Sequence, residues 1–441
     1  MHEWFGKFVR GRAFAAIFCV LGMVMAAYLA LRLGMLLEAF TAVDLRLWIF
    51  AVLAVFSGYM LVYTNSGKAQ KRTWKLFNFC GTVLCYLLSM VICFLLFDGV
   101  RLLLGLRDSR LYLIPLLLAL ALTVYGFLHA RKLRIRTYRV PLAGAEEGGT
   151  VKTLVLLSDI HVGSYVDSKQ LHKIVSAANQ VGADMVVLAG DTFDQDAFDR
   201  CDRAAVKREL QALQPRGAVY AVLGNHDPNS GRQEIRRFFQ EAGIHLLVDA
   251  CAATADFLVA GRDDILGNPH RKPLEELLGE GASEKPVIVV DHNPLGIDDG
   301  VRLGADLVLC GHTHKGQFFP ATVFTKLAYG PRGFYGHYQT GRTHSVVSSG
   351  AGAWGPTVRS WPSRWYCPLL RREARRGSTP KRSDIQQPRP ARRPGLHDYW
   401  ASSPASSRKG EAPPLAGMLV YGASCWSSSS SRVLYCSSVR G

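Results

Sequence analysis

Residues 153–161 read TLVLLSDIH, an apolar run that ends directly at Asp159 and His161. Such a run of β-branched and aliphatic residues, bounded by polar ones, predicts a buried strand over Thr153–Leu157. Further strands are predicted at Met185–Ala189, Ala218–Leu223, Val287–Val290 and Leu307–Cys310, with helices at Lys169–Asn179 and Gln233–Glu241 between them. Strands that alternate with helices indicate a layered α/β domain.

Each of these five predicted strands is followed by Asp, His or Asn. The segments that follow them are Ser158-Asp159-Ile160-His161, Gly190-Asp191, Gly224-Asn225-His226-Asp227, Asp291-His292-Asn293-Pro294 and Gly311-His312-Thr313-His314. Because α/β proteins bind ligands beyond the carboxyl ends of their parallel strands, we expect these side chains to converge in space.

The residue types favour a pair of divalent cations. Two cations about 3.5–4 Å apart need a shared anionic oxygen, which a carboxylate such as Asp191 can supply. A mixture of imidazole and carboxylate suits Mn, Fe or Zn better than Ca or Mg. The expected chemistry is attack on phosphorus by a metal-activated water.

Each motif alone has a simpler interpretation. An isolated Asp-x-His occurs often by chance, and a single His after a strand, such as His292, is more often a turn residue. The GNHD segment is also compatible with an ordinary turn, because Gly, Asn and Asp favour turns. The five motifs together, in this order and each at a strand end, favour a metal site.

The motif series resembles that of the calcineurin-like metallophosphoesterase superfamily: DxH, GD, GNH(D/E), H and GHxH. The later segments Gly316-Gln317 and Trp354-Gly355-Pro356 resemble its membrane-anchored bacterial branch, whose pattern is GHTHGGQ; here Lys315 replaces the first glycine of GG. The segment GDTFD lacks the continuation GDxVDRG of protein Ser/Thr phosphatases, which argues against that activity.

The resemblance implies a role for each matching residue. One metal would be held by Asp159, His161, Asp191 and His314, and the second by Asp191, Asn225, His292 and His312. His226 would donate a proton to the leaving oxygen, and Asp227 would orient His226. The implied fold is two packed mixed β-sheets flanked by helices.

The N-terminal third predicts a membrane anchor. Apolar runs at Ala13–Ala30, Leu47–Tyr63, Leu76–Phe97 and Leu111–Ala130 are each about long enough to cross a bilayer. Basic residues flank both ends of this region and fill its second loop, which favours a catalytic domain on the cytoplasmic side of the cell membrane. The expected organisation is a four-helix transmembrane anchor (1–130), a juxtamembrane basic segment and linker (131–150) and the metallophosphoesterase domain (151–357).

Residues 358–441 differ in character from the rest. The chain carries a net charge of +17, of which residues 359–441, rich in Ser, Arg and Pro, hold the larger part. We expect this tail to be disordered. Its abrupt change in composition favours out-of-frame translation of a GC-rich gene over a genuine basic tail that binds anionic lipid.

The leading hypothesis is therefore a membrane-anchored, dinuclear-metal phosphohydrolase acting on a phosphodiester, a phosphomonoester or a pyrophosphate. The anchor favours a lipid-linked phosphoester substrate, and the sequence specifies no oligomeric state. One alternative is a catalytically idle sensor or scaffold of the same fold, against which the complete ligand set counts. The other is a nuclease, but nucleic acid is a poor fit to a protein whose positive charge is concentrated in the tail.

Overall fold

The structure is a computed structural model. It describes residues 12–65, 70–130, 132–142, 151–163, 166–195, 197–228, 232–279, 285–355, 358–359 and 365–371.

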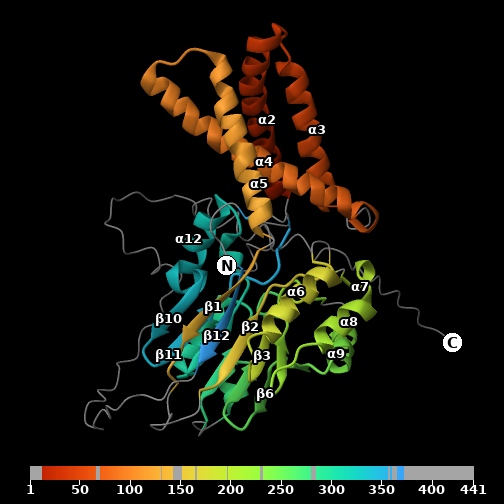
Figure 1. Cartoon of the computed structure of the whole chain (residues 1–441), viewed down its shortest axis with the longest axis vertical. Helices are drawn as coiled ribbons and strands as arrows, with labels where there is room; N and C mark the ends of the chain where they lie inside the picture. Colours follow the sequence, from red (N-terminus) through yellow and green to blue (C-terminus); the bar gives the residue numbers. More distant parts are fainter. Residues whose placement is uncertain are drawn as a thin grey trace, which may run out of the picture.

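The N-terminal helices are gathered at one end of the molecule (Figure 1). They are α2 (Arg12–Thr41), α3 (Arg46–Asn65), α4 (Gln70–Leu104), η1 (Ser109–Tyr112) and α5 (Leu113–Ala130). Three stretches are long and apolar enough to cross a membrane: Cys19–Thr41, Phe79–Leu104 and Ser109–Ala130. The apolar part of α3, Arg46–Leu61, is shorter. The predicted apolar multi-helix N-terminus is confirmed, and a count of four spans stays a prediction.

The rest of the described chain alternates strands and helices. Its first half contains β1 (Leu133–Arg139), β2 (Thr153–Leu157), α6 (Ser168–Asn179), β3 (Met185–Ala189), α7 (Ala197–Arg200), α8 (Arg203–Gln211), β4 (Val219–Val222), α9 (Arg232–Glu241), β5 (His245–Leu246) and β6 (Ala250–Ala253). Its second half contains β7 (Leu258–Gly261), α10 (Leu274–Leu278), β8 (Val287–Val290), η2 (Pro294–Gly296), α11 (Ile297–Arg302), β9 (Leu307–Cys310), η3 (His314–Gly316), α12 (Ala321–Phe334), β10 (Gly336–Thr340), β11 (Thr343–Val347) and β12 (Trp365–Arg371).

These strands form two six-stranded sheets, in the orders β1-β12-β2-β3-β4-β5 and β10-β11-β9-β8-β7-β6. Both sheets are mixed: β2 to β5 run parallel, as do β7, β8, β9 and β11, whereas β12, β6 and β10 each have an antiparallel neighbour. The fold class expected from the sequence is confirmed. The five strands and two helices predicted for the α/β domain match the observed ones to within one residue at each end.

Apolar residues fill the layer between the sheets because their central strands are buried on both faces. Leu156, Val187, Val259 and Leu309 meet in one buried cluster there. A second cluster packs α6, α8 and α9 against the outer face of the first sheet. The helices are set by local signals: Asp167 caps α6 by accepting a hydrogen bond from the Gln170 N–H at 2.8 Å. Strand pairing and the apolar layer between the sheets together hold the carboxyl ends of β2, β3, β4, β8 and β9 at one edge.

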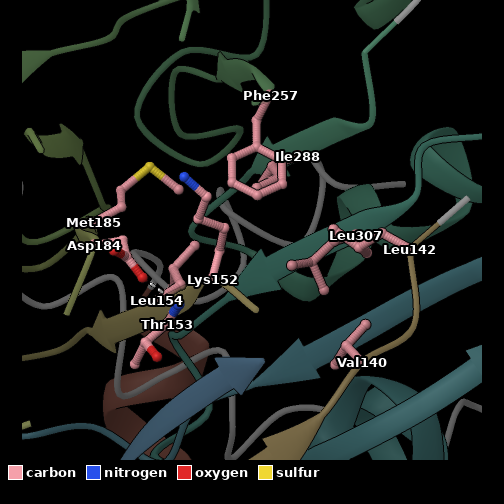
Figure 2. Close-up of a pocket in the computed structure, with 10 residues that line it drawn as sticks. All are labelled: Val140, Leu142, Lys152, Thr153, Leu154, Asp184, Met185, Phe257, Ile288 and Leu307. Carbon is pink, nitrogen blue, oxygen red and sulfur yellow. Dashed lines mark hydrogen bonds between the residues drawn. The ribbon is translucent and has the colours of Figure 1, made fainter. Parts of the chain in front are cut away.

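A small cavity of about 20 Å³ also lies between the sheets (Figure 2). Thr153, Met185, Ile288 and Leu307 line it, and these residues stand at or beside the amino ends of β2, β3, β8 and β9. It lies at the edge opposite the polar strand ends and has room for about one water molecule, so it is too small for a phosphoester substrate.

The expectation for residues 131–150 was incomplete. Leu133–Arg139 is not merely a basic linker but forms β1, the edge strand of the first sheet. In this strand Arg134 and Arg136 alternate with Ile135 and Thr137, and most of its residues are exposed. An edge strand can be largely charged, so it lacks the apolar pattern by which a buried strand is predicted.

The boundary at residue 357 was also wrong. Residues 365–371 form β12, which pairs in parallel with β1 and antiparallel with β2. This strand contains Pro368, which cannot donate to a ladder. It stands opposite Arg136 of β1, and the pairing with β2 begins one residue later, at Leu369. The rest of the tail, residues 372–441, lies outside the described residues.

Arg359, at the start of the predicted tail, is completely buried. Its guanidinium donates to the carbonyls of Ser349 and Gly352, at 3.1 and 3.0 Å, and its backbone N–H donates to the carbonyl of Gly126 in α5 at 3.0 Å. Burial lowers the pKa of Arg359 to about 10. This residue therefore ties α5 to the α/β domain.

Because β12 lies between β1 and β2, we expect two truncations to differ sharply. A chain that ends at Val358 lacks β12 and Arg359 and should lose its cooperative thermal transition. A chain that ends at Arg371 keeps every strand of the described sheet and should keep that transition. Thermal unfolding in detergent, followed by intrinsic fluorescence, measures the difference. Equal melting of the two chains would contradict the placement of β12.

Candidate metal centre

Five of the predicted metal ligands, in the loops after the strands, have an unusual backbone conformation. Asp159, His161, Asp191, His312 and His314 have φ between 47° and 74°. Residues other than glycine rarely adopt this left-handed conformation, which costs about 1–3 kcal/mol each and clusters at functional sites. The fold therefore accepts local strain at the residues predicted to bind metal.

The first group of possible ligands is Asp159, His161 and His314, all buried. The Nε2 atoms of His161 and His314 lie 3.0 Å apart, and His314 Nε2 lies 3.4 Å from Asp159 Oδ1. The Asp159 carboxylate also accepts the backbone N–H of His312, which joins the first and last motifs. Gly311 permits this approach, because a Cβ there would stand 2.4 Å from Asp159 Oδ2.

The second group is Asp191, His292 and His312. His292 Nε2 lies 3.2 Å from Asp191 Oδ2, and the ring of His292 contacts that of His312 edge to face. Asn225 joins this group, since its Oδ1 lies 2.8 Å from His312 Nδ1.

Asp191 lies between the two groups. Its Oδ2 is 3.2 Å from His292 Nε2 in the second group and 3.7 Å from His161 Nε2 in the first. Its Oδ1 accepts the His226 backbone N–H at 2.7 Å. The structure thus brings all seven predicted ligands to one edge, with one carboxylate placed to serve two cations.

The hydrogen bonds of the two central imidazoles fit a metal site. His292 Nδ1 lies 2.9 Å from the carbonyl of Ala189, which can only accept, so Nδ1 carries the proton of the neutral ring. In that neutral form Nε2 is unprotonated and faces the Asp191 carboxylate, so that a cation between the two could bind both. His161 is set in the same way, with Nδ1 3.0 Å from Asp194 Oδ1 and Nε2 directed at the first group.

The charges of this cluster also favour cations. Although burial opposes a charged carboxylate, His292 and His226 hold the pKa of Asp191 well below its usual range. Although burial also opposes a charged imidazole, Asp191 raises the pKa of His292 well above its usual range, so a proton on this ring occupies the place that a bound metal would take. Burial lowers the pKa of His312 to about 3, so this ring is neutral and able to bind a metal. The residues present therefore fit two divalent cations.

Two supporting residues had no role in the sequence prediction. Asp194, in GDTFD, orients His161, and Tyr329 of α12 places its hydroxyl 2.7 Å from His312 Nε2. The GD motif could have drawn attention to Asp194, three residues after Asp191. Tyr329 carries no motif, and its position follows from the packing of α12.

We expect Asp194→Ala to weaken metal binding by about 10–100-fold, because His161 loses the acceptor that fixes its tautomer. Asp194→Asn keeps an oxygen acceptor and should lose less. Metal affinity is measured by competition with a fluorescent chelator. If both variants bind metal as the parent chain does, Asp194 does not support His161.

His226 lies beside the metal groups. Its ring centroid is 5.3 Å from that of His161 and 5.9 Å from that of Trp354, and 8% of the residue is exposed. Burial lowers the pKa of His226. Its backbone N–H bond to Asp191 fixes the turn that carries it.

The sequence predicts that Asp227 orients the His226 ring, whereas in the structure the Asp227 carboxylate binds backbone N–H groups. Asp227 Oδ1 accepts from the Phe193 N–H at 2.9 Å and Oδ2 from the Gly224 N–H at 2.8 Å. Burial raises the pKa of Asp227 to about 7. This carboxylate positions the loop that bears Asn225 and His226, because both of its oxygens are engaged by backbone groups.

Comparison with known proteins agrees with this geometry. Residues 152–316 match the family model of the calcineurin-like phosphoesterases. The chain is 32% identical over 270 residues to a "Transmembrane protein with metallophosphoesterase domain" from Danio rerio, covering 57% of this chain and 60% of that protein. It is 30% identical over 280 residues to an uncharacterised metallophosphoesterase from Campylobacter jejuni, covering 60% of this chain and 73% of that protein.

Among solved structures, a dimetal phosphatase from Danio rerio is 14% identical, with a TM-score of 0.29; the match covers 49% of this chain and 90% of that one. The chain spans less than two thirds of several of its relatives, 56% in the case of a Helicobacter pylori metallophosphoesterase. The family model covers all five motifs, and the chain covers most of the Campylobacter relative. The chain therefore belongs to the calcineurin-like phosphoesterase family.

Proposed function

We propose that this chain is a membrane-anchored phosphohydrolase that uses two divalent metal ions to cleave a phosphodiester, a phosphomonoester or a pyrophosphate. The observation that carries the proposal is the pair of Asp/His groups that Asp191 joins, as a member of one group and 3.7 Å from His161 Nε2 of the other. A buried set of acceptors without cations would be costly, because buried charges need partners.

The ligands divide between the two cations as follows: Asp159, His161, Asp191 and His314 for one, and Asp191, Asn225, His292 and His312 for the other. When bound, such a pair supplies an activated water and positive charge for the phosphoryl oxygens. The mixed imidazole and carboxylate ligands favour Mn, Fe or Zn.

The chain's own groups would do the remaining work. The His226 imidazole would donate a proton to the leaving oxygen, a task that suits histidine. Asp227 would support it indirectly, by holding the loop through Phe193 and Gly224. Lys315, which replaces a glycine of the GHTHGGQ pattern, has its Nζ 4.6 Å from the centroid of the Tyr335 ring. It adds positive charge directly after His314.

We also propose a lipid-linked phosphoester as the substrate and a cytoplasmic location for the catalytic domain. The apolar helices support the first, because they place the enzyme at a membrane, as does the name of the Danio rerio relative. The basic flanks of the helices support the second.

The test is hydrolysis of bis-p-nitrophenyl phosphate and p-nitrophenyl phosphate by the full chain, stripped of metal and then supplied with Mn²⁺. We expect manganese-dependent turnover, and the ratio of the two rates then gives the diester or monoester preference. Metal-loaded, folded protein without turnover on either ester would favour an idle scaffold instead.

A further inference from the structure

Helix α12 presents large apolar side chains to solvent. Phe319, just before the helix, Val323 and Leu327 are 46%, 45% and 59% exposed. Val323 and Leu327 are four residues apart and so share one side of the helix, and Phe319 lies two residues before its start. We call these three residues the α12 apolar face. Contiguous exposed apolar side chains of this size mark an interaction surface more often than isolated ones do.

Helix α12 lies at the end of the catalytic domain nearest the N-terminal helices, where the chain leaves α5 (Figure 1). Contacts in the structure fix that position. Ala130, the last residue of α5, packs against Ala353, and the neighbouring Trp354 exchanges two hydrogen bonds with Gln317. Gln317 stands four residues before α12, so the helix begins beside the segment on which α5 rests.

The same helix borders the metal centre. Tyr329 is half-buried, and its hydroxyl lies 2.7 Å from Nε2 of His312. An exposed cation, Lys326, is adjacent to Leu327. Apolar side chains with a lysine beside them are typical of helices that lie in the interfacial plane of a bilayer.

We propose that the α12 apolar face docks onto the surface of the bilayer that the anchor helices cross, with Lys326 at the phosphate headgroups. A membrane is the occupant that the position favours, because α12 begins beside the segment that the end of the last apolar helix contacts. Docking would bring the part of the metal centre that α12 borders, near Tyr329 and His312, close to the membrane. Given the proposed function, this identifies the substrate class as a phosphoester borne by a lipid headgroup.

Lipid contact is tested without reference to activity. The full chain, carrying the photoreactive amino acid p-benzoylphenylalanine in place of Leu327, is reconstituted in vesicles of phosphatidylcholine and phosphatidylglycerol and irradiated. We expect a lipid adduct at this position by mass spectrometry. The matched control is the same replacement at Gln339, an exposed residue of β10, which should give none. A protein–protein adduct at position 327, or equal lipid adducts at both positions, would overturn the proposal.

A second experiment measures the consequence for the substrate. We expect Val323→Glu/Leu327→Glu to lower the ratio of turnover on a vesicle-borne phospholipid to turnover on bis-p-nitrophenyl phosphate by about tenfold, because two apolar side chains no longer enter the interface. Gln339→Glu should leave the ratio unchanged. An unchanged ratio in the double variant would contradict docking. If the parent chain turned over neither substrate, the proposed function would be contradicted. The lipid adduct at position 327 would still report docking in that case.

Discussion

Asp191→Ala should abolish hydrolysis, with a fall in turnover of at least about 10³-fold, because several kcal/mol of transition-state stabilisation depend on the metal pair. Asp191 is within 3.7 Å of imidazole nitrogens from both ligand groups. Its loss would remove the one anion placed to be shared, and it would also free the His226 backbone N–H that Asp191 now accepts.

The measurement is turnover of bis-p-nitrophenyl phosphate together with bound metal per chain. A matched control is Asp256→Ala, whose carboxylate pairs with Lys152. The control should keep both activity and metal. If Asp191→Ala retained two metals and most of its turnover, Asp191 would not be the shared ligand.

His226→Ala should have the second largest effect, a fall in turnover of about 10²–10⁴-fold with metal content unchanged. The reason is that His226 would protonate the leaving oxygen, whereas the ligands of both groups remain intact. The loss should be greater for a phenyl ester than for a p-nitrophenyl ester, because the less acidic phenol needs the proton more.

The comparison of the two esters separates proton donation from a structural role. His245→Ala, at an exposed histidine of β5, is the control and should resemble the parent chain. Equal losses for the two esters in His226→Ala would contradict proton donation, and loss of metal would indicate that His226 supports the ligands instead.

The convergence of these Asp and His side chains could be predicted from the sequence because each of them follows a short buried strand. Apolar runs such as Thr153–Leu157 define where a strand ends, and parallel strands bring those ends to one edge. The spacing of Asp159 and His161, or of His312 and His314, therefore carried real structural information. The two groups in the structure contain these residues together with Asp191 and His292.

Other features depend on partners distant in the chain, so no local pattern predicts them. Tyr329 supports His312 only because α12 packs over that loop, and Asp227 meets the backbone of Phe193 rather than the neighbouring imidazole. Strands β1 and β12 stabilise each other, although more than two hundred residues separate them in the chain. Neither has the apolar pattern of a buried strand, since one alternates with arginine and the other contains Pro368.

The central claim is that one carboxylate joins two metal ions in a single site. Electron paramagnetic resonance of the full chain loaded with Mn²⁺ tests it directly. At about two Mn²⁺ per chain, ions 3.5–4 Å apart should give an exchange-coupled spectrum, and Asp191→Ala should lose it. A spectrum of isolated Mn²⁺ alone, at full loading of the parent chain, would contradict the account.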